Sequence, residues 1–161
     1  MGTSFETPAD AEDAYYDAID DSDLAKMMEV WSDSPEATCL LPMQTLQQGP
    51  DAIRELWQTM LDKTLGLDIT INHITWIACG DVAIHLLEEM VSLGNGKQRQ
   101  PPIYATNVYR RKDAGWQLLI HVNSPSPPPP SPGSDTDPGT ESRYQKILMA
   151  NFSASAPEAT E

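Results

Sequence analysis

The sequence predicts an α+β domain in which three N-terminal helices precede a long antiparallel sheet. Apolar residues recur at helical spacing in three segments before residue 62, and from Leu67 onward the pattern changes to the alternation of strands. Four runs rich in Ile, Val, Thr and Trp follow, at about 67–78, 81–93, 101–112 and 115–124. Their short Gly- and Asp-containing junctions are typical of antiparallel hairpins. This order indicates helices packed on one face of a curved antiparallel sheet.

Capping and periodicity predict where the helices lie. Thr7 suits an N-cap and Pro8 the first helical position, which predicts a first helix at about 8–20. Ser22 is expected to cap a second helix with an apolar face of Leu24, Met27, Met28 and Trp31. Short extended segments are expected at 37–41 and 44–48. Gly49-Pro50 then begins a third helix, whose inward face is Ile53, Leu56, Trp57, Met60 and Leu61.

A proline-rich stretch marks the expected end of the domain. Residues 125–133 cannot form a helix interior or a sheet ladder, so we predict a domain at 1–124 and a Pro-rich linker with an acidic tail at 125–161. Within the tail, 143–152 has an apolar helical face and is either a short docking helix or part of a mostly disordered segment. The second is favoured, because isolated helices this short are marginal in water.

Composition excludes several classes of protein. The 161 residues suit one domain, and the net charge of -14, with ten scattered Lys and Arg, argues against a nucleic-acid surface. No apolar run approaches membrane-spanning length, and no signal peptide is recognisable. Residues 1–23 hold eight acids, Glu12 among them, and no base. We interpret them as a solvated face, with a basic protein partner as the alternative.

The two cysteines, Cys39 and Cys79, each lie in a strand-like apolar run. Both are therefore expected to be buried, unpaired core residues in a reducing compartment. With the missing signal peptide, this predicts a cytoplasmic protein. The sequence has no phosphate loop, paired-cysteine motif or metal-ligand spacing, so we expect no cofactor and no metal.

Strand alternation selects candidate pocket residues. His121 would share a face with Gln117 and Leu119, opposite Trp116, Leu118 and Ile120, while His85 alternates with Ala83 and Leu87, and Asn107 with Ile103, Ala105 and Tyr109. If these faces are concave, either histidine could act as general acid or base and Asn107 as a hydrogen-bond donor. The alternative for each is a hydrogen bond in the core. No role is expected for His73.

Aromatic and acidic side chains extend this candidate site. Tyr15 and Tyr16 lie side by side on a helix, so only one is expected to face inward and donate to a ligand oxygen. Trp31 and Trp57 would form apolar walls of the pocket, part of the hydrophobic core, or both. Glu88 and Glu89 are adjacent, so the pleat sends one of them inward. We interpret both as surface acids at a strand end, with a buried base as the alternative.

A combination of short motifs resembles the SnoaL-like branch of the nuclear transport factor 2-like superfamily over about residues 8–124. The matching positions are Tyr15, Asp23-Leu24, Trp31 to Asp33, Gly49-Pro50 before Ile53 and Trp57, Asp81 to Ala83, and Ala105 to Tyr109 before Gly115-Trp116. The resemblance implies a cystatin-like cone with a pocket between a curved sheet and its helices, commonly in a homodimer. It also makes Tyr15 similar to the oxyanion-hole tyrosine of ketosteroid isomerase.

The resemblance does not extend to the isomerase base, a carboxylate just before a proline. Leu41 precedes Pro42 here, so ketosteroid isomerase activity is not expected, and Leu41 becomes a candidate ligand contact. We predict a homodimeric domain that binds a small, mainly apolar organic molecule, with isomerase-, dehydratase- or cyclase-type proton transfer by His121, His85 and Tyr15 as the enzyme hypothesis. The competing hypothesis is a noncatalytic binding or dimerisation module for protein partners.

Overall fold

The protein was analysed as a computed structural model that describes residues 5–113 and 115–125. The helices are α1 (Pro8–Asp20), α2 (Leu24–Val30) and α3 (Pro50–Met60). The strands are β1 (Thr38–Leu40), β2 (Gln47–Gln48), β3 (Asp68–Cys79), β4 (Val82–Leu93), β5 (Gln98–Arg99), β6 (Ile103–Lys112) and β7 (Gly115–Pro125). The predicted helices and four long strands are confirmed. The predicted tail lies outside the described residues from 126 onward.

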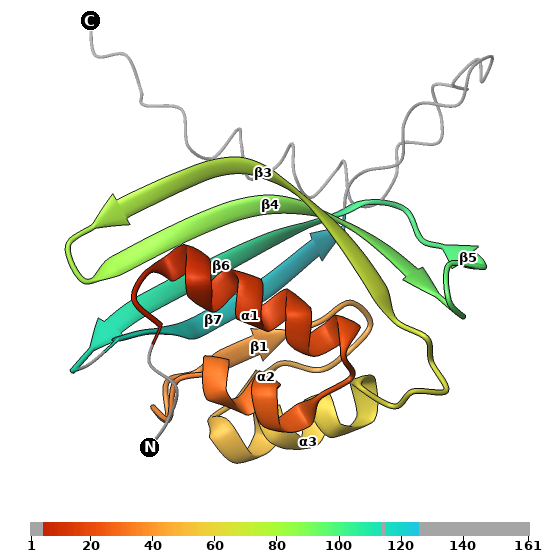
Figure 1. Cartoon of the computed structure of the whole chain (residues 1–161), viewed down its shortest axis with the longest axis horizontal. Helices are drawn as coiled ribbons and strands as arrows, with labels where there is room; N and C mark the ends of the chain where they lie inside the picture. The colour runs from red at the N-terminus through yellow and green to blue at the C-terminus, as the bar shows by residue number, and fades with distance from the viewer. Residues whose placement is uncertain (1–4, 114, 126–161) are drawn as a thin grey trace, which may run out of the picture. The chain divides into compact units, whose positions relative to one another are not determined.

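The sheet has the strand order β2-β1-β7-β6-β4-β3, with β5 paired to β4. The strands β3, β4, β6 and β7 pair antiparallel, as predicted, but β1 pairs parallel with β7. The sheet is therefore mixed, and the prediction of an antiparallel sheet is wrong at this edge. Parallel neighbours need a long connection, and here α3 and three long strands separate β1 from β7. All three helices lie on one side of the sheet (Figure 1).

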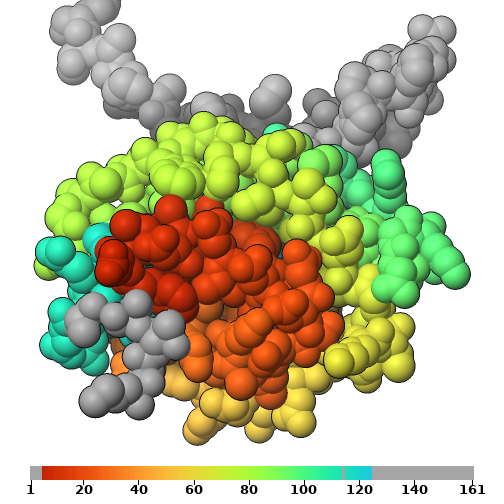
Figure 2. Space-filling model, viewed as in Figure 1, coloured from red at the N-terminus to blue at the C-terminus, as the bar shows by residue number. Residues whose placement is uncertain are grey.

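Local hydrogen bonds fix the helix ends. The Thr7 side chain accepts from the backbone N–H of Asp10, and the Asp10 side chain accepts from that of Thr7, which completes a capping box for α1. The N-cap of α2 is Asp23, which accepts from the backbone of Lys26, and not Ser22 as predicted. Ser22 instead turns the chain with a φ of 52°. In Figure 2, α1 and α2 cover the middle of the visible face.

A bulge in β7 overturns the predicted alternation around His121. Val108 pairs with Ile120 but Tyr109 pairs with Leu118, so Leu119 is the extra residue. Because of this shift, Leu118 and His121 are both buried on the helix-covered side of the sheet. The prediction that they lie on opposite faces is wrong.

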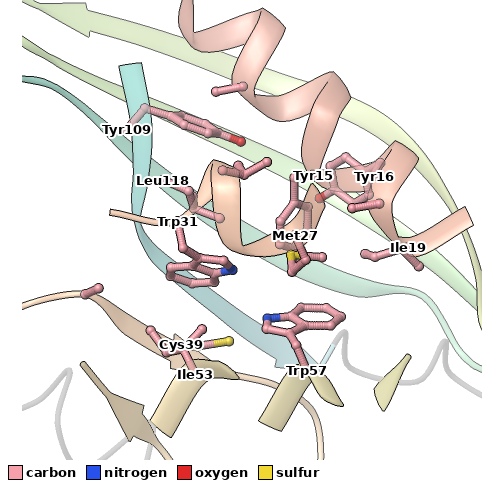
Figure 3. Close-up of a cluster of buried hydrophobic side chains, with 14 of the residues drawn as sticks. Tyr15, Tyr16, Ile19, Met27, Trp31, Cys39, Ile53, Trp57, Tyr109 and Leu118 are labelled. Atoms are coloured by element: carbon pink, nitrogen blue, oxygen red, sulfur yellow. The ribbon is translucent and has the colours of Figure 1, made fainter. Parts of the chain in front are cut away.

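The core lies between the helices and the concave side of the sheet. Tyr15, Trp31 and Trp57 converge there, as Figure 3 shows, and each is almost fully buried. Trp31 follows the last residue of α2 and forms a bridge with Leu118, so its predicted place on the helical face is wrong. No helix among the described residues is long and apolar enough to cross a membrane.

The two cysteines differ in environment. Both are free, as predicted, but Cys39 is buried in β1 whereas Cys79 is exposed. Cys79 ends β3, which is the last strand of the sheet and, within residues 5–113 and 115–125, pairs only with β4. The prediction of two buried cysteines is therefore wrong for Cys79.

Candidate functional site

A cavity of about 190 Å³ opens between the sheet and the helices. Its walls are mainly apolar and include Leu41, Trp57, Met60, Ile69, Val91 and Ile103. Glu89, His121 and Asn123 also line it and bring ionisable and amide groups to this apolar space. The cavity is therefore open, although Trp57 and Met60 form part of its wall. This is the typical composition of a small-molecule site, which combines apolar walls with a few placed polar groups.

Glu89 is a buried acid held by two donors. It lies on β4, where alternation places it on the same face as His85 and Leu87, and its side chain is 2% exposed. Its Oε1 accepts from the Tyr16 hydroxyl at 2.7 Å and its Oε2 from Asn123 Nδ2 at 2.9 Å. Both oxygens act as acceptors, which suits an ionised carboxylate. Burial raises the pKa of Tyr16 well above its ordinary value, and the nearby Glu89 raises it further, so Tyr16 keeps its proton.

His121 is buried between two amides. Its Nδ1 lies 2.5 Å from Asn107 Oδ1, and its Nε2 lies 3.0 Å from Asn123 Oδ1. Its ring centroid is 5.1 Å from that of Tyr15. Since Asn123 also donates to Glu89, the imidazole and the carboxylate are joined through one amide.

Tyr15 supplies a neutral hydroxyl beside this group. Burial raises its pKa well above the ordinary value, and the nearby Glu89 carboxylate acts in the same direction. The ring lines the cavity, and the hydrogen bonds found within the described residues do not include its hydroxyl. The hydroxyl is therefore a candidate donor for an oxygen atom of a ligand.

A second buried acid, Glu12 of α1, lies at the other side of Asn107. Its Oε1 is 2.5 Å from His73 Nε2 and its Oε2 is 2.8 Å from His85 Nδ1, while Tyr109 donates to Oε2 at 3.2 Å. Burial raises the pKa of Glu12, but the hydrogen bonds and charges of the two histidines outweigh burial and leave its pKa below the ordinary value. Glu12 is therefore ionised at neutral pH.

The contacts around Glu12 extend to β3 at the sheet edge, where the Trp76 ring stacks on the His85 ring with centroids 4.1 Å apart. No group of three or more His, Cys, Asp or Glu side chains within residues 5–113 and 115–125 is arranged to hold a metal ion. We therefore describe Glu12, His73 and His85 as a hydrogen-bonded cluster that ties α1 to β3 and β4.

The described fold and cavity agree with a match to a family model, the SnoaL-like domain, over residues 9–128. The chain belongs to the SnoaL-like domain family. Solved structures of nuclear transport factor 2-like proteins share its cone fold. A comparison with functionally curated proteins returned no match.

Three solved structures illustrate the similarity. A protein from Thiobacillus denitrificans ATCC 25259, named provisionally as an association domain of calcium/calmodulin-dependent protein kinase type II, is 31% identical, covering 78% of this chain and 99% of its own, with a TM-score of 0.71. A protein from Streptomyces avermitilis, named provisionally as a dehydratase of the NTF2-like family, is 21% identical, covering 73% and 92%, with a TM-score of 0.66. An NTF2-like superfamily protein from Salmonella enterica is 18% identical, covering 78% and 91%, with a TM-score of 0.59. The last two establish the fold alone.

The structure separates the predicted site residues of this SnoaL-like domain into two groups. The cavity is lined by His121, Tyr15, Trp57 and Leu41. The remaining candidates, His85, Tyr16, Trp31 and Asn107, are buried but do not line it. Tyr16 and Asn107 contact Glu89 and His121, the polar residues of the lining. Their roles in binding or catalysis stay predictions.

The prediction that only one of Tyr15 and Tyr16 faces inward is wrong. They are 1% and 8% exposed, and their rings pack edge to face with centroids 4.9 Å apart. The helix α1 lies along the concave side of the sheet and also contacts α2, so more than one of its faces is covered (Figure 1).

Sequence reasoning missed Glu12, Asn123 and the partner of His73, and it gave a buried acid at Glu88 or Glu89 only as the alternative to a surface pair. Interpreting Glu12 and Glu89 as solvated surface acids is wrong, since they are 1% and 2% exposed. A signal for Glu89 existed, because it lies four residues after His85 on one strand face. Similarly, Glu12 lies four residues before Tyr16 on one helix face. Nothing in the sequence connects Glu12 to His73, because only the tertiary fold brings α1 to β3.

Proposed function

We propose that this SnoaL-like domain binds a small, mainly apolar organic molecule with a carbonyl group and transfers a proton on it. The observation that carries this proposal is a buried carboxylate, Glu89, in the lining of an otherwise apolar cavity. The volume of about 190 Å³ lies below the about 300–1,000 Å³ typical of sites for drug-sized ligands, which favours a small ligand.

The proposed chemistry assigns separate roles to neighbouring groups. The Glu89 carboxylate accepts a proton from the carbon next to the carbonyl, the C–H electron pair forms a carbon–carbon double bond, and negative charge develops on the carbonyl oxygen. Tyr15 donates a hydrogen bond to that oxygen. Return of the proton to a different carbon gives isomerisation. Loss of a hydroxyl group from the carbon next to the deprotonated one, with the proton returned by Glu89, releases water and gives dehydration.

This proposal retains His121 and Tyr15 from the predicted catalytic set but leaves out His85. His85 bonds Glu12 and does not line the cavity, whereas His121 lines it. His121 is joined through Asn123 to Glu89, so it can influence charge on the reacting groups without itself accepting the proton.

Proton abstraction can be measured without knowing the natural substrate. Full-length protein is incubated in D₂O with a panel of small cyclic and linear ketones, and deuterium incorporation beside the carbonyl is followed by NMR. We expect exchange with at least one ketone, and a loss of about 100-fold or more in Glu89→Gln. Exchange that is unaffected by Glu89→Gln, or absent throughout the panel, would contradict the proposed chemistry.

The location of binding is tested by filling the cavity. Val91→Trp places an indole at the lining, while the matched variant Met90→Trp changes the next residue on β4, which points to the outer face. Ketone binding, measured by ligand-observed NMR, should be lost in the first variant and retained in the second. Equal binding by both variants would place the ligand elsewhere.

A second candidate function, homodimerisation, is supported by the outer face of the sheet. Ile77, Met90 and Tyr104 point away from the helices and are 51%, 38% and 37% exposed. We infer that a second copy of the chain covers this apolar face, which would agree with the relative from Thiobacillus denitrificans being named for an association domain.

Solution mass tests this second candidate. Light scattering coupled to gel filtration should give a dimer for the unaltered chain and a monomer for Ile77→Lys. Leu46→Lys is the control, because Leu46 is exposed and apolar but lies outside the sheet face. A monomeric unaltered chain would reject this function without affecting the ligand proposal.

A further inference from the structure

Both ring nitrogens of His121 face oxygen atoms of amide side chains. Nδ1 faces Asn107 Oδ1 at 2.5 Å and Nε2 faces Asn123 Oδ1 at 3.0 Å. An amide oxygen only accepts hydrogen bonds, so each of the two contacts needs an N–H on the imidazole. A neutral imidazole carries one N–H and can satisfy only one of them.

The orientation of Asn123 follows from its other contacts. Its Nδ2 donates to Glu89 Oε2 at 2.9 Å and lies 3.4 Å from the backbone carbonyl oxygen of Tyr104. Turning the amide would place Oδ1 against these two acceptors. The carboxylate of Glu89 is already held as an acceptor by Tyr16, so the Asn123 oxygen is left to face His121.

The orientation of Asn107 is fixed in a similar way. Its Nδ2 lies 3.5 Å from Glu12 Oε2 and 3.4 Å from the Tyr16 hydroxyl oxygen. The Tyr16 hydrogen is donated to Glu89, so this oxygen acts as an acceptor. A turned amide would direct its oxygen at a carboxylate and at a second acceptor, which is unfavourable in a buried site.

We propose that His121 is held inside the domain as an imidazolium, protonated at both nitrogens, and that Asn107 and Asn123 are the positioning residues that fix this state. The contacts then run from the Glu12 carboxylate through the Asn107 amide to the His121 imidazolium, and on through the Asn123 amide to the Glu89 carboxylate. Each amide gives its oxygen to the cation and its NH₂ to an anion. A buried cation one amide away from two anions is compensated on both sides.

The other titratable groups around His121 are consistent with this state. Tyr15 packs against its ring from α1, and Cys39 is its register partner on β1. Burial raises the pKa of the Cys39 thiol to about 12, and burial likewise raises the pKa of Tyr15, so both are neutral. The nearby negative charges are therefore those of Glu89 and Glu12.

This inference rests on the proposed function and its cavity. It narrows the class of carbonyl compounds that the site would accept as substrates. A cation in the cavity wall stabilises negative charge on a ligand oxygen, while Glu89 remains the group that accepts a proton. The pair suits carbonyl compounds that react through an enolate. It also assigns His121 to charge stabilisation, because an imidazole protonated at both nitrogens cannot act as a base.

The protonation state is measured directly on full-length protein carrying ¹⁵N-labelled histidine. The chain has three histidines, so His121→Gln assigns the His121 signals in a long-range ¹H–¹⁵N spectrum. At about pH 7.5 an imidazole with the reference pKa of about 6.5 is mostly neutral. We expect both nitrogens of His121 to be protonated there, and one unprotonated nitrogen in the unaltered protein would overturn the proposal.

Variants of Asn123 test the positioning role. Asn123→Leu removes the oxygen that faces Nε2 and should leave one N–H on His121, whereas Asn123→Asp keeps an acceptor and should retain both. The control is Asn72→Leu, because Asn72 is exposed on β3, and it should leave the spectrum unchanged. If Asn123→Leu folds and His121 keeps both N–H groups, the positioning role of Asn123 is overturned. If Asn123→Leu does not fold, the loss of one N–H from His121 in Asn123→Asp overturns that role.

No ligand is present in these spectra, so they separate the two proposals. Ketone exchange can be absent while His121 is doubly protonated, which would reject only the proposed function. Conversely, exchange that depends on Glu89, with a neutral His121, would reject only this inference.

Discussion

The hydroxyl of Tyr16 donates to Oε1 of Glu89 at 2.7 Å and thereby links α1 to the middle of β4. Both residues are buried, so water does not replace this hydrogen bond when it is lost. The contact therefore supports the helix–sheet packing and holds one oxygen of the cavity carboxylate in place.

Tyr16→Phe should destabilise the domain by about 1.5–3 kcal/mol, the range for hydrogen bonds to charged groups. The ring and its packing are kept, so the loss reports on the hydroxyl. Urea unfolding followed by tryptophan fluorescence measures the difference. Tyr104→Phe is the control, because Tyr104 is 37% exposed on the outer face, and it should change stability by less than about 0.5 kcal/mol. Equal effects of the two variants would show that the Tyr16 contact adds no stability.

Glu12→Gln should destabilise the domain by about 1.5–3 kcal/mol at neutral pH, because it removes the charged acceptor that His73, His85 and Tyr109 contact. The pKa of Glu12 in the folded protein lies below its ordinary value of 4.5. Its contribution to stability is therefore present above about pH 4.5 and is lost as the pH falls through the folded pKa.

The free energy of unfolding of the unaltered chain should accordingly fall between neutral pH and the acid range more steeply than that of Glu12→Gln. Urea titrations at a series of pH values measure both slopes. Asp17→Asn changes an exposed acid of the same helix and should keep the slope of the unaltered chain. Parallel curves for Glu12→Gln and the unaltered chain would mean that folding does not lower the pKa of Glu12.

The elements were predictable because they depend on local chemistry. The capping box at Thr7 and Asp10 and the Pro50 start of α3 need only neighbouring residues, and they are seen in the sequence. The parallel pairing of β1 was not predictable from such signals. It depends on where α1 and α2 direct the chain before it reaches the sheet edge.

The site was predicted only in part, for a related reason. Strand alternation identified His121 and His85 as inward residues, and both are buried. Their partners were hidden, because Glu12 looked like one of many acids in an acidic segment and Glu89 like half of a surface pair. Whether an acid is solvated or buried depends on what the fold places over it. Spacing puts Glu12 on a face with Tyr16 and Glu89 on a face with His85, but it does not show that these faces are covered.

The thiols should differ sharply in reactivity. Burial raises the pKa of Cys39 to about 12, so it is a neutral, inaccessible thiol, whereas Cys79 is exposed. Titration with a disulfide reagent should therefore modify one thiol per chain in the native protein and both in denaturant. Cys79→Ser should abolish the native reaction and Cys39→Ser should keep it. Rapid native modification of Cys39 would show that β1 opens readily.

Gly66 and Gly80 offer a matched pair for testing a close backbone approach. Both have a left-handed φ, of +56° and +61°, so an alanine at either position costs about 1–2 kcal/mol. At Gly66 a Cβ would also lie 2.6 Å from the backbone nitrogen of Asn95, which itself donates to the Gly66 carbonyl oxygen at 3.2 Å. At Gly80 no atom lies within 4 Å of that position.

Gly66→Ala should therefore lower the free energy of unfolding by more than Gly80→Ala, with an excess of about 1 kcal/mol or more from the displaced turn. Urea unfolding of the two variants side by side measures the excess. The effect should extend to binding, because Leu67 and Leu93, which adjoin the two contacting segments, line the cavity. Ketone affinity should thus fall in Gly66→Ala and not in Gly80→Ala. Equal stability and equal affinity of the two variants would show that the turn moves freely and does not shape the cavity.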